Sequence, residues 1–168
     1  EGRSALLVLT FYVNGKGLAA LVPAARDWPQ PQRHVVTLSG RTDFPQHFTV
    51  SAALAASAGS PLSDVVGLYK ELDDARIGSG FSFNDIAADR AGTRFGALAV
   101  SGVAGLARIG RMASAGLQES DLIPDVRDLP EFLSQAEFQR RFGGVDQPRY
   151  REMLERIEQR IAALPLYR

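Results

Sequence analysis

The chain has 168 residues and no cysteine, which excludes disulfide bonds, thiolate metal sites and a cysteine nucleophile. It also lacks a long hydrophobic run. The longest apolar stretch near its start, residues 5–13, is far shorter than the about 20 residues that span a bilayer. Neither charge predominates, because 19 basic residues match 19 acidic ones, and the two parts divided after Asn84 are each balanced. A large nucleic-acid-binding surface is therefore not expected.

The overall composition is that of a folded globular protein. Apolar residues make up 45% of the chain and charged residues 23%, proportions that exclude a disordered or collagen-like chain. The length is that of one domain of ordinary size, or of one domain with an arm. Because the sequence opens on Glu1-Gly2 without a start methionine, we expect that a signal peptide or lipid anchor has been removed. We expect membrane contact only through such a leader or anchor.

Hydrophobic periodicity and helix-breaking residues predict a mostly α fold: a compact helical domain built on a helical hairpin, with a helical C-terminal extension. Residues 1–42 are an apolar segment, either a core helix or the end of a leader, followed by a proline-rich linker. Residues 43–116 form the core and residues 117–168 the extension. Glycine, proline and capping residues predict helices at about 47–57, 62–76, 84–100 and 147–164, a helical stretch that reaches 115, a short helix after Ser134, and an extended piece at 34–39.

Polar residues are densest in residues 70–92. A Gly-Ser-Gly connection at residues 78–80 predicts that the two flanking helices fold into an antiparallel hairpin. Helical spacing gives each of these helices one acidic face, formed by Glu71 and Asp74 on the first and by Asp85 and Asp89 on the second. Small residues on the second helix favour a close approach, so the two acidic faces can meet: Ala87, Ala88, Ala91 and Gly92.

His47 is the second feature of interest, because it begins a predicted helix and has Ser51 one turn later on the same side. Taken singly, a histidine or carboxylate is more often a structural or solvated group. Asp85, for example, is also explained as the last residue of a capping box that begins at Ser82. Glu71 lies in the middle of its helix, where capping does not explain it. It is therefore the strongest single candidate for a functional residue.

Four short segments carry these residues in a distinctive order: Asp43-x-x-x-His47-Phe48, Ser51-Ala-Ala, Lys70-Glu71-x-x-Asp74-x-Arg76 and Gly78-Ser-Gly-Phe-Ser-x-x-Asp85-x-x-x-Asp89-x-x-Gly92. The pattern, over about residues 43–96, resembles that of the YfiM-type family of small bacterial envelope lipoproteins. A looser series of His, Glu, Arg, Asp and Gly is similar to that of VanZ-like membrane proteins. The resemblance implies a compact helical core and a location in the cell envelope, either periplasmic or associated with the outer membrane. It implies no established reaction.

One hypothesis is a hydrolase or lyase that acts on peptidoglycan or another envelope glycan. Two carboxylates can divide acid and base catalysis when burial raises the pKa of one of them. Glu71 is then the general acid or base, and its catalytic partners are His47 and either Asp74 or Asp85. The substrate-binding residues would be Asp89, Arg76, which suits an anionic substituent, and three residues lining a cleft at the hairpin, Ser79, Phe81 and Ser82.

The same region also offers an oxygen-rich ligand set with one nitrogen. Such a set suits a divalent ion such as Mg²⁺, Mn²⁺ or Ca²⁺, and Zn²⁺ less well. No recognised metal-binding spacing such as His-Glu-x-x-His is present. We therefore assign no metal ligands from the sequence and expect no cofactor. The side chains in this set are His47, Glu71, Asp74, Asp85 and Asp89.

The other hypothesis, which the sequence slightly favours, is a non-enzymatic scaffold or partner-binding protein. Its carboxylates would be neutralised in a network that fixes helix packing, by Lys70, Arg76, Arg90 and Arg94. The C-terminal helices would bind a protein or another envelope component, with Phe132, Phe138 and Phe142 as anchors or as plain core. An open cleft with unpaired carboxylates at Glu71 and His47 would favour the enzyme, and a closed, fully paired interior would favour the scaffold.

Overall fold

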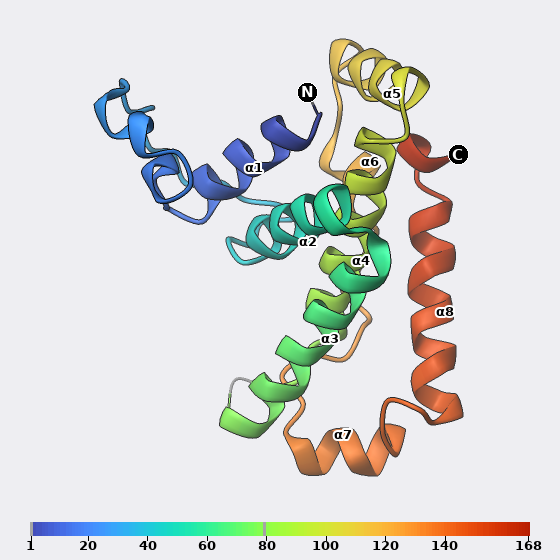
Figure 1. The fold of residues 1–168 in the computed structure, drawn as a ribbon. Coiled ribbons are helices and arrows are strands. Elements are labelled where there is room, and N and C mark those ends of the chain that lie inside the picture. Colours follow the sequence, from blue (N-terminus) through green and yellow to red (C-terminus); the bar gives the residue numbers. More distant parts are fainter. Residues whose placement is uncertain (1, 79) are drawn as a thin grey trace.

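The computed structural model describes residues 2–78 and 80–168, and the regular secondary structure of this part is helical (Figure 1). The predicted mostly α fold is confirmed, since the only β-type pairings among the described residues are two isolated bridges. None of the described helices is long and apolar enough to cross a membrane. The helices are α1 (Gly2–Val13), α2 (Phe44–Ala58), α3 (Ser60–Ile77), α4 (Phe83–Ala99), α5 (Val103–Ser114), α6 (Glu119–Leu122), α7 (Gln135–Phe142) and α8 (Pro148–Ala162), with short 3₁₀ helices η1 (Leu18–Ala20), η2 (Pro23–Asp27) and η3 (Pro165–Tyr167).

Local sequence signals set the ends of the helices that carry the site. The Asp43 side chain accepts the backbone N–H of Phe44 at the start of α2. Gly78 ends α3 with a φ of 109°, a conformation that glycine adopts without strain. The predicted cap at Ser134 is confirmed, because its hydroxyl accepts the N–H of Glu137 and the Glu137 carboxylate reaches back to Ser134.

Helices α2 and α4 approach each other closely because two glycines of α4 face the backbone of α2. A Cβ atom on Gly92 would lie 2.1 Å from the carbonyl oxygen of Phe48, and one on Gly96 would lie 2.1 Å from that of Ala52. No real Cβ tolerates such a distance, so these two positions admit only glycine at this helix separation. The contact fixes the position of α4 relative to the first turns of α2, where His47 lies.

Alanine at Gly92 or Gly96 is expected to destabilise the fold by about 1–3 kcal/mol, the usual cost of overpacking. The added methyl group would meet a backbone carbonyl, which cannot rotate away as a side chain can. Gly110→Ala in α5 is the matched control, since nothing lies within 4 Å of its Cβ position and alanine favours helix. Thermal unfolding compares the three variants, and equal melting temperatures for Gly92→Ala and Gly110→Ala would contradict the close contact.

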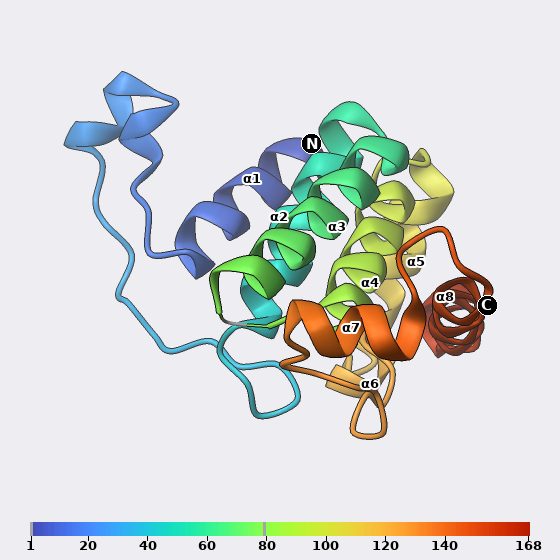
Figure 2. The same cartoon turned by 90° about the horizontal axis from the view of Figure 1, so that it is seen from below.

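The C-terminal helices pack onto the hairpin through a group of aromatic rings, so the hydrophobic core spans both sides of the boundary expected near residue 117. Figure 2 shows α7 and α8 beside the bundle of α1 to α4. Of the three phenylalanines considered as partner anchors, only Phe132 is exposed, at 62%. The aromatic group consists of Phe81, Phe83, Phe138, Phe142 and Tyr150.

Residues 14–37 form an arm that projects from the helical body (Figures 1 and 2). The apolar segment at the start of the chain is a helix, α1, and its Leu6 is buried against alanines of α2. The extended piece expected at 34–39 forms no strand, and only Leu38 of this segment pairs, in an isolated bridge to Arg41.

Candidate functional site

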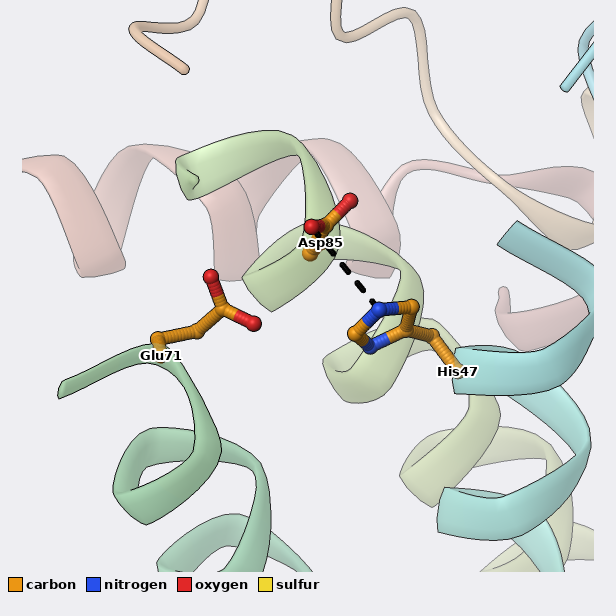
Figure 3. A group of neighbouring side chains, drawn as sticks. All are labelled: His47, Glu71 and Asp85. Carbon is orange, nitrogen blue, oxygen red and sulfur yellow. Dashed lines mark ion pairs between the residues drawn. The ribbon is translucent and has the colours of Figure 1, made fainter. Parts of the chain in front are cut away.

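Three helices bring His47, Glu71 and Asp85 together near the start of α4 (Figure 3). His47 comes from the first turn of α2, Glu71 from the second half of α3 and Asp85 from the first turn of α4. One nitrogen or oxygen atom of each side chain lies within 4.8 Å of the others. Glu71 has no exposed surface, and His47 and Asp85 are each 9% exposed. Three ionisable side chains therefore share one interior site.

Glu71 takes the place of a capping carboxylate at the start of α4. Its Oε2 accepts the backbone N–H of Ser82, the residue that precedes α4, at 2.9 Å. The predicted capping box is wrong, because the N–H that Asp85 would accept is donated to Glu71. Asp85 is left to face His47 instead, with Asp85 Oδ2 3.7 Å from Nε2. Helix capping therefore does not explain the presence of a carboxylate at Asp85. The hydrogen bond to Ser82, made between two helices, explains the buried position of Glu71.

Burial and the charge of Asp85 raise the pKa of Glu71 from 4.5 to about 7. The Ser82 N–H, the Lys70 ammonium 3.4 Å from Oε1, and His47 act in the opposite direction without restoring the ordinary value. Burial also raises the pKa of Asp85, against the opposing charge of His47. Both carboxyl groups therefore hold a proton more readily than in water.

His47 lies between two carboxylates of α4, with one at each ring nitrogen. Nδ1 is 3.2 Å from Asp89 Oδ1, and Ser51 Oγ donates to the same oxygen at 2.8 Å. Nε2 is the nitrogen that faces Asp85. Burial alone would lower the pKa of His47, but the hydrogen bond to Asp89 and the charges of both carboxylates raise it overall. The imidazole is thereby fixed in orientation by α4.

Two carboxylate oxygens of the site are buried and have no hydrogen-bond donor among the described residues: Asp85 Oδ1 and Asp89 Oδ2. The Arg41 guanidinium is 3.6 Å from Asp85 Oδ1, too far for a hydrogen bond, and its N–H groups bond Asp43 and Glu131 instead. A buried carboxylate oxygen without a donor is costly. The interior is therefore closed, but it is not the fully paired network that a purely structural role would favour.

Other predicted site residues lie apart from this cluster or outside the described part. Asp74 pairs with Lys70 at 2.6 Å, where both side chains are partly exposed. Phe81 is fully buried among the aromatic rings of the core, so it lines no cleft at the hairpin. The side chain of Arg76, and Ser79 as a whole, lie outside the described residues. The binding roles expected for those two residues stay predictions.

Arg41 belongs to the site and was not found from the sequence. Its side chain lies over the Phe44 ring, 4.4 Å from the ring centre, and contacts Asp43, Asp85 and Glu131. The one local signal is its position two residues before the helix-capping Asp43. The contacts to Asp85 and Glu131 depend on tertiary structure, and no periodicity predicts them.

Two of the pockets formed by the described residues border the cluster, and neither of these two is lined by Glu71 or Asp85. The smaller has a volume of about 150 Å³ and includes His47, Ser51, Lys70 and Asp89 in its wall. The larger, of about 780 Å³, reaches this region only through Arg41, Phe44 and Asn84. Because sites for small organic ligands usually measure about 300–1,000 Å³, the pocket at His47 suits water or an ion better than a sugar ring.

Comparisons with known proteins give no match in a scan of protein-family models, a search of curated proteins or a search of solved structures. The resemblance to the YfiM-type lipoproteins therefore stays a prediction, as does the envelope location that it implies. The chemistry open to the site is inferred from its geometry alone.

Proposed function

We propose that the protein binds a divalent cation through His47, Glu71 and Asp85, and that this cation fastens α2, α3 and α4 to one another. The observation that carries the proposal is the separation of the three ligand atoms, within 4.8 Å of one another, in a site almost closed to solvent. Ligands at about 2.0–2.4 Å from one ion lie at most about 4–5 Å apart. Only a small movement of these side chains would therefore bring all three ligand atoms within coordination distance of one ion.

The partners of His47 support a metal ligand at Nε2. Histidines that bind metals usually donate the other ring N–H to a carboxylate or carbonyl, which fixes the tautomer and orients the ring. Asp89 Oδ1 lies 3.2 Å from Nδ1, and Ser51 holds that oxygen in turn. Nε2 faces the Asp85 carboxylate, on the side of the three-residue cluster.

The charges of the site also support a bound cation. Its buried ionisable groups are three carboxylates, on Glu71, Asp85 and Asp89, and one imidazole. Among the described side chains, two partly exposed cations reach them, and both are shared with carboxylates outside the cluster, since Arg41 also bonds two acidic residues and Lys70 bonds Asp74. Buried carboxylates in excess must be neutralised, either by protons or by a metal ion.

The ligand set selects a class of ion. One imidazole nitrogen with two carboxylates suits Mn²⁺ or Zn²⁺, whereas Ca²⁺ takes six to eight oxygen ligands. Three protein ligands leave room for water at such an ion. The chain itself supplies the orientation of the ligands, through Asp89 behind His47 and the Ser82 N–H behind Glu71.

A non-enzymatic scaffold in the bacterial cell envelope is the physiological role that we propose for this cation-stabilised fold. Its support is the likeness of residues 43–96 to the YfiM-type pattern and the absence of exposed surface on Glu71, which a glycan chain would have to reach. The partner would be a protein or another envelope component bound through the C-terminal helices.

A second candidate function is a hydrolase or lyase acting on peptidoglycan or another envelope glycan. One observation favours it: the pKa of Glu71, raised to about 7, suits a general acid or base at neutral pH. In this proposal the helices that cover Glu71 would have to separate to admit the substrate. Release of soluble fragments from purified cell walls, lost in Glu71→Gln, would support this function over the scaffold.

Cation binding is tested by calorimetric titration and thermal unfolding of protein freed of metal with a chelator. We expect one Mn²⁺ or Zn²⁺ per chain, and about 2.7 kcal/mol of added stability when the free ion is 100 times its Kd. Mg²⁺ and Ca²⁺ should bind more weakly.

The variants His47→Gln and Asp85→Asn should lose this binding and the cation-dependent rise in melting temperature. Asp128→Asn is the control, because its carboxylate is exposed and pairs with Arg156 and Arg160, away from the cluster. Unaltered binding in His47→Gln, or no stoichiometric binding in the parent chain, would refute the proposed site.

A further inference from the structure

Helix α1 is apolar on two of its faces. Leu6 is buried against α2, as expected of a packed helix. A second stripe, with helical spacing, contains Ala5, Val8, Leu9 and Tyr12, and Val8 and Leu9 are 48% and 45% exposed. A helix of a globular protein normally turns its polar side outward. Val8 and Leu9 of the second stripe therefore stay largely uncovered by the described chain.

The arm continues this apolar surface. Trp28, Leu21 and Val22 are 52%, 54% and 42% exposed, and Trp28 lines a groove of about 540 Å³ together with Val8 and Leu9. The arm is tied to α1 by hydrogen bonds from the Tyr12 hydroxyl to the carbonyl of Gln32 and from Arg33 to the carbonyl of Tyr12. Figure 2 shows the arm and α1 at one side of the molecule, away from α7 and α8.

Positive charge accompanies this apolar surface, whereas the rest of the chain carries a small excess of acidic residues. Residues 2–34 contain four basic residues and one acidic residue, whereas residues 35–168 contain 15 basic and 17 acidic residues. Lys16 and Arg33 line the groove itself, and no ion pair to either is present among the described residues. The four basic residues are Arg3, Lys16, Arg26 and Arg33.

We propose that α1 and the arm, residues 2–37, form a docking surface for an anionic lipid bilayer. Exposed tryptophan and aliphatic side chains flanked by lysine and arginine are typical of segments that lie in the membrane interface. The basic side chains complement the negative charge of anionic headgroups, and Trp28, Val8 and Leu9 enter the boundary with the acyl chains. None of the proposed cation ligands belongs to this surface, so this inference does not depend on cation binding.

Trp28 is the only tryptophan of the protein, which makes its fluorescence a specific probe of this surface. The full chain is mixed with vesicles of phosphatidylcholine alone, and with vesicles of an equal mixture of phosphatidylcholine and phosphatidylglycerol. We expect the emission of Trp28 to move to shorter wavelength with the anionic vesicles, and the protein to sediment with them. Added salt should reverse much of the binding, because it screens the headgroup charge.

Substitutions separate the charged and apolar contributions. Each of Lys16→Gln and Arg26→Gln should weaken binding to the anionic vesicles about five-fold. The matched control is the pair Arg111→Gln and Arg151→Gln, exposed basic residues on α5 and α8, which should change little. Val8→Ser with Leu9→Ser should abolish the shift in emission.

Three results would overturn the proposal. In the first, the emission of Trp28 is unchanged by both kinds of vesicle and the protein stays in the supernatant. In the second, the control pair weakens binding as much as the arm variants, which would indicate attraction without a defined surface. In the third, Trp28 becomes buried at high protein concentration without lipid, which would assign the surface to self-association.

Discussion

Glu71→Gln is expected to raise the stability of the cation-free protein at pH 8 by about 3 kcal/mol, or roughly 5–10 °C in melting temperature. The pKa of Glu71 rises from 4.5 to about 7 on folding. Above pH 7 the folded state therefore contains a buried carboxylate charge that destabilises it relative to the unfolded state. Glutamine keeps the shape and an oxygen for the Ser82 N–H, and its amide group can donate toward Asp85. The buried charge is removed without leaving a cavity.

The sign of the pH dependence follows from the same pKa. Because the folded state binds the Glu71 proton more tightly than the unfolded state, the stability of the cation-free protein falls as pH rises from 4.5 through about 7. The raised pKa of Asp85 acts in the same direction. So does that of His47, whose stabilising contribution is lost as pH rises through its folded-state pKa. Glu71→Gln should therefore flatten the pH profile without removing the slope.

Denaturant unfolding in chelator at several pH values between 5 and 8 measures this effect. Asp128→Asn is the control that should keep the parent profile, because Arg160 lowers the pKa of Asp128 to about 2, outside this range. In the presence of Mn²⁺ or Zn²⁺ the parent chain should show the opposite trend, because deprotonated ligands bind the ion. If the Glu71→Gln protein were less stable than the parent at pH 8 in chelator, the charge of Glu71 would be fully neutralised by neighbouring groups. The cluster would then be a purely structural network.

The helices were predictable because their ends are encoded locally. Asp43 before Pro45, Gly78 in a left-handed conformation and the Ser134–Glu137 pair each act within a few residues of themselves. The Ser82–Asp85 box failed for a tertiary reason. The Ser82 N–H is donated to Glu71, eleven residues earlier on the other helix of the hairpin. No local pattern predicts whether Glu71 or Asp85 accepts this hydrogen bond.

The grouping of His47, Glu71 and Asp85 could be proposed from the sequence because helical spacing assigns each to a face and the glycine connection brings two of the faces together. The choice between Asp74 and Asp85 as the second carboxylate depends on the rotation of each helix. That rotation is set by contacts far apart in the chain, such as Gly92 against Phe48. Asp74 pairs with Lys70, which also lies 3.4 Å from Glu71, so the two carboxylates share one side of α3 and Glu71 is the one that reaches His47 and Asp85.

Phe81→Ala is expected to be the most damaging single substitution, at about 3–5 kcal/mol. Phe81 is fully buried, its ring centre lies 4.3 Å from that of Phe138 and 5.0 Å from that of Phe83, and its backbone pairs with Leu133. Loss of the ring leaves a cavity where the hairpin meets the C-terminal helices. Phe132→Ala is the control, because its ring is 62% exposed and should change stability by less than about 1 kcal/mol.

The same substitution tests whether the C-terminal helices help to hold the site. Phe81 directly precedes Ser82, whose N–H positions Glu71, so movement of this segment should lower cation affinity together with stability. His47→Gln should also lower cation affinity, and it should destabilise the cation-free fold because Asp85 and Asp89 lose their buried imidazole partner. If Phe81→Ala were as stable as Phe132→Ala and lost only binding, Phe81 would be a ligand-contacting residue of an opened cleft. That result would favour the glycan hydrolase over the scaffold.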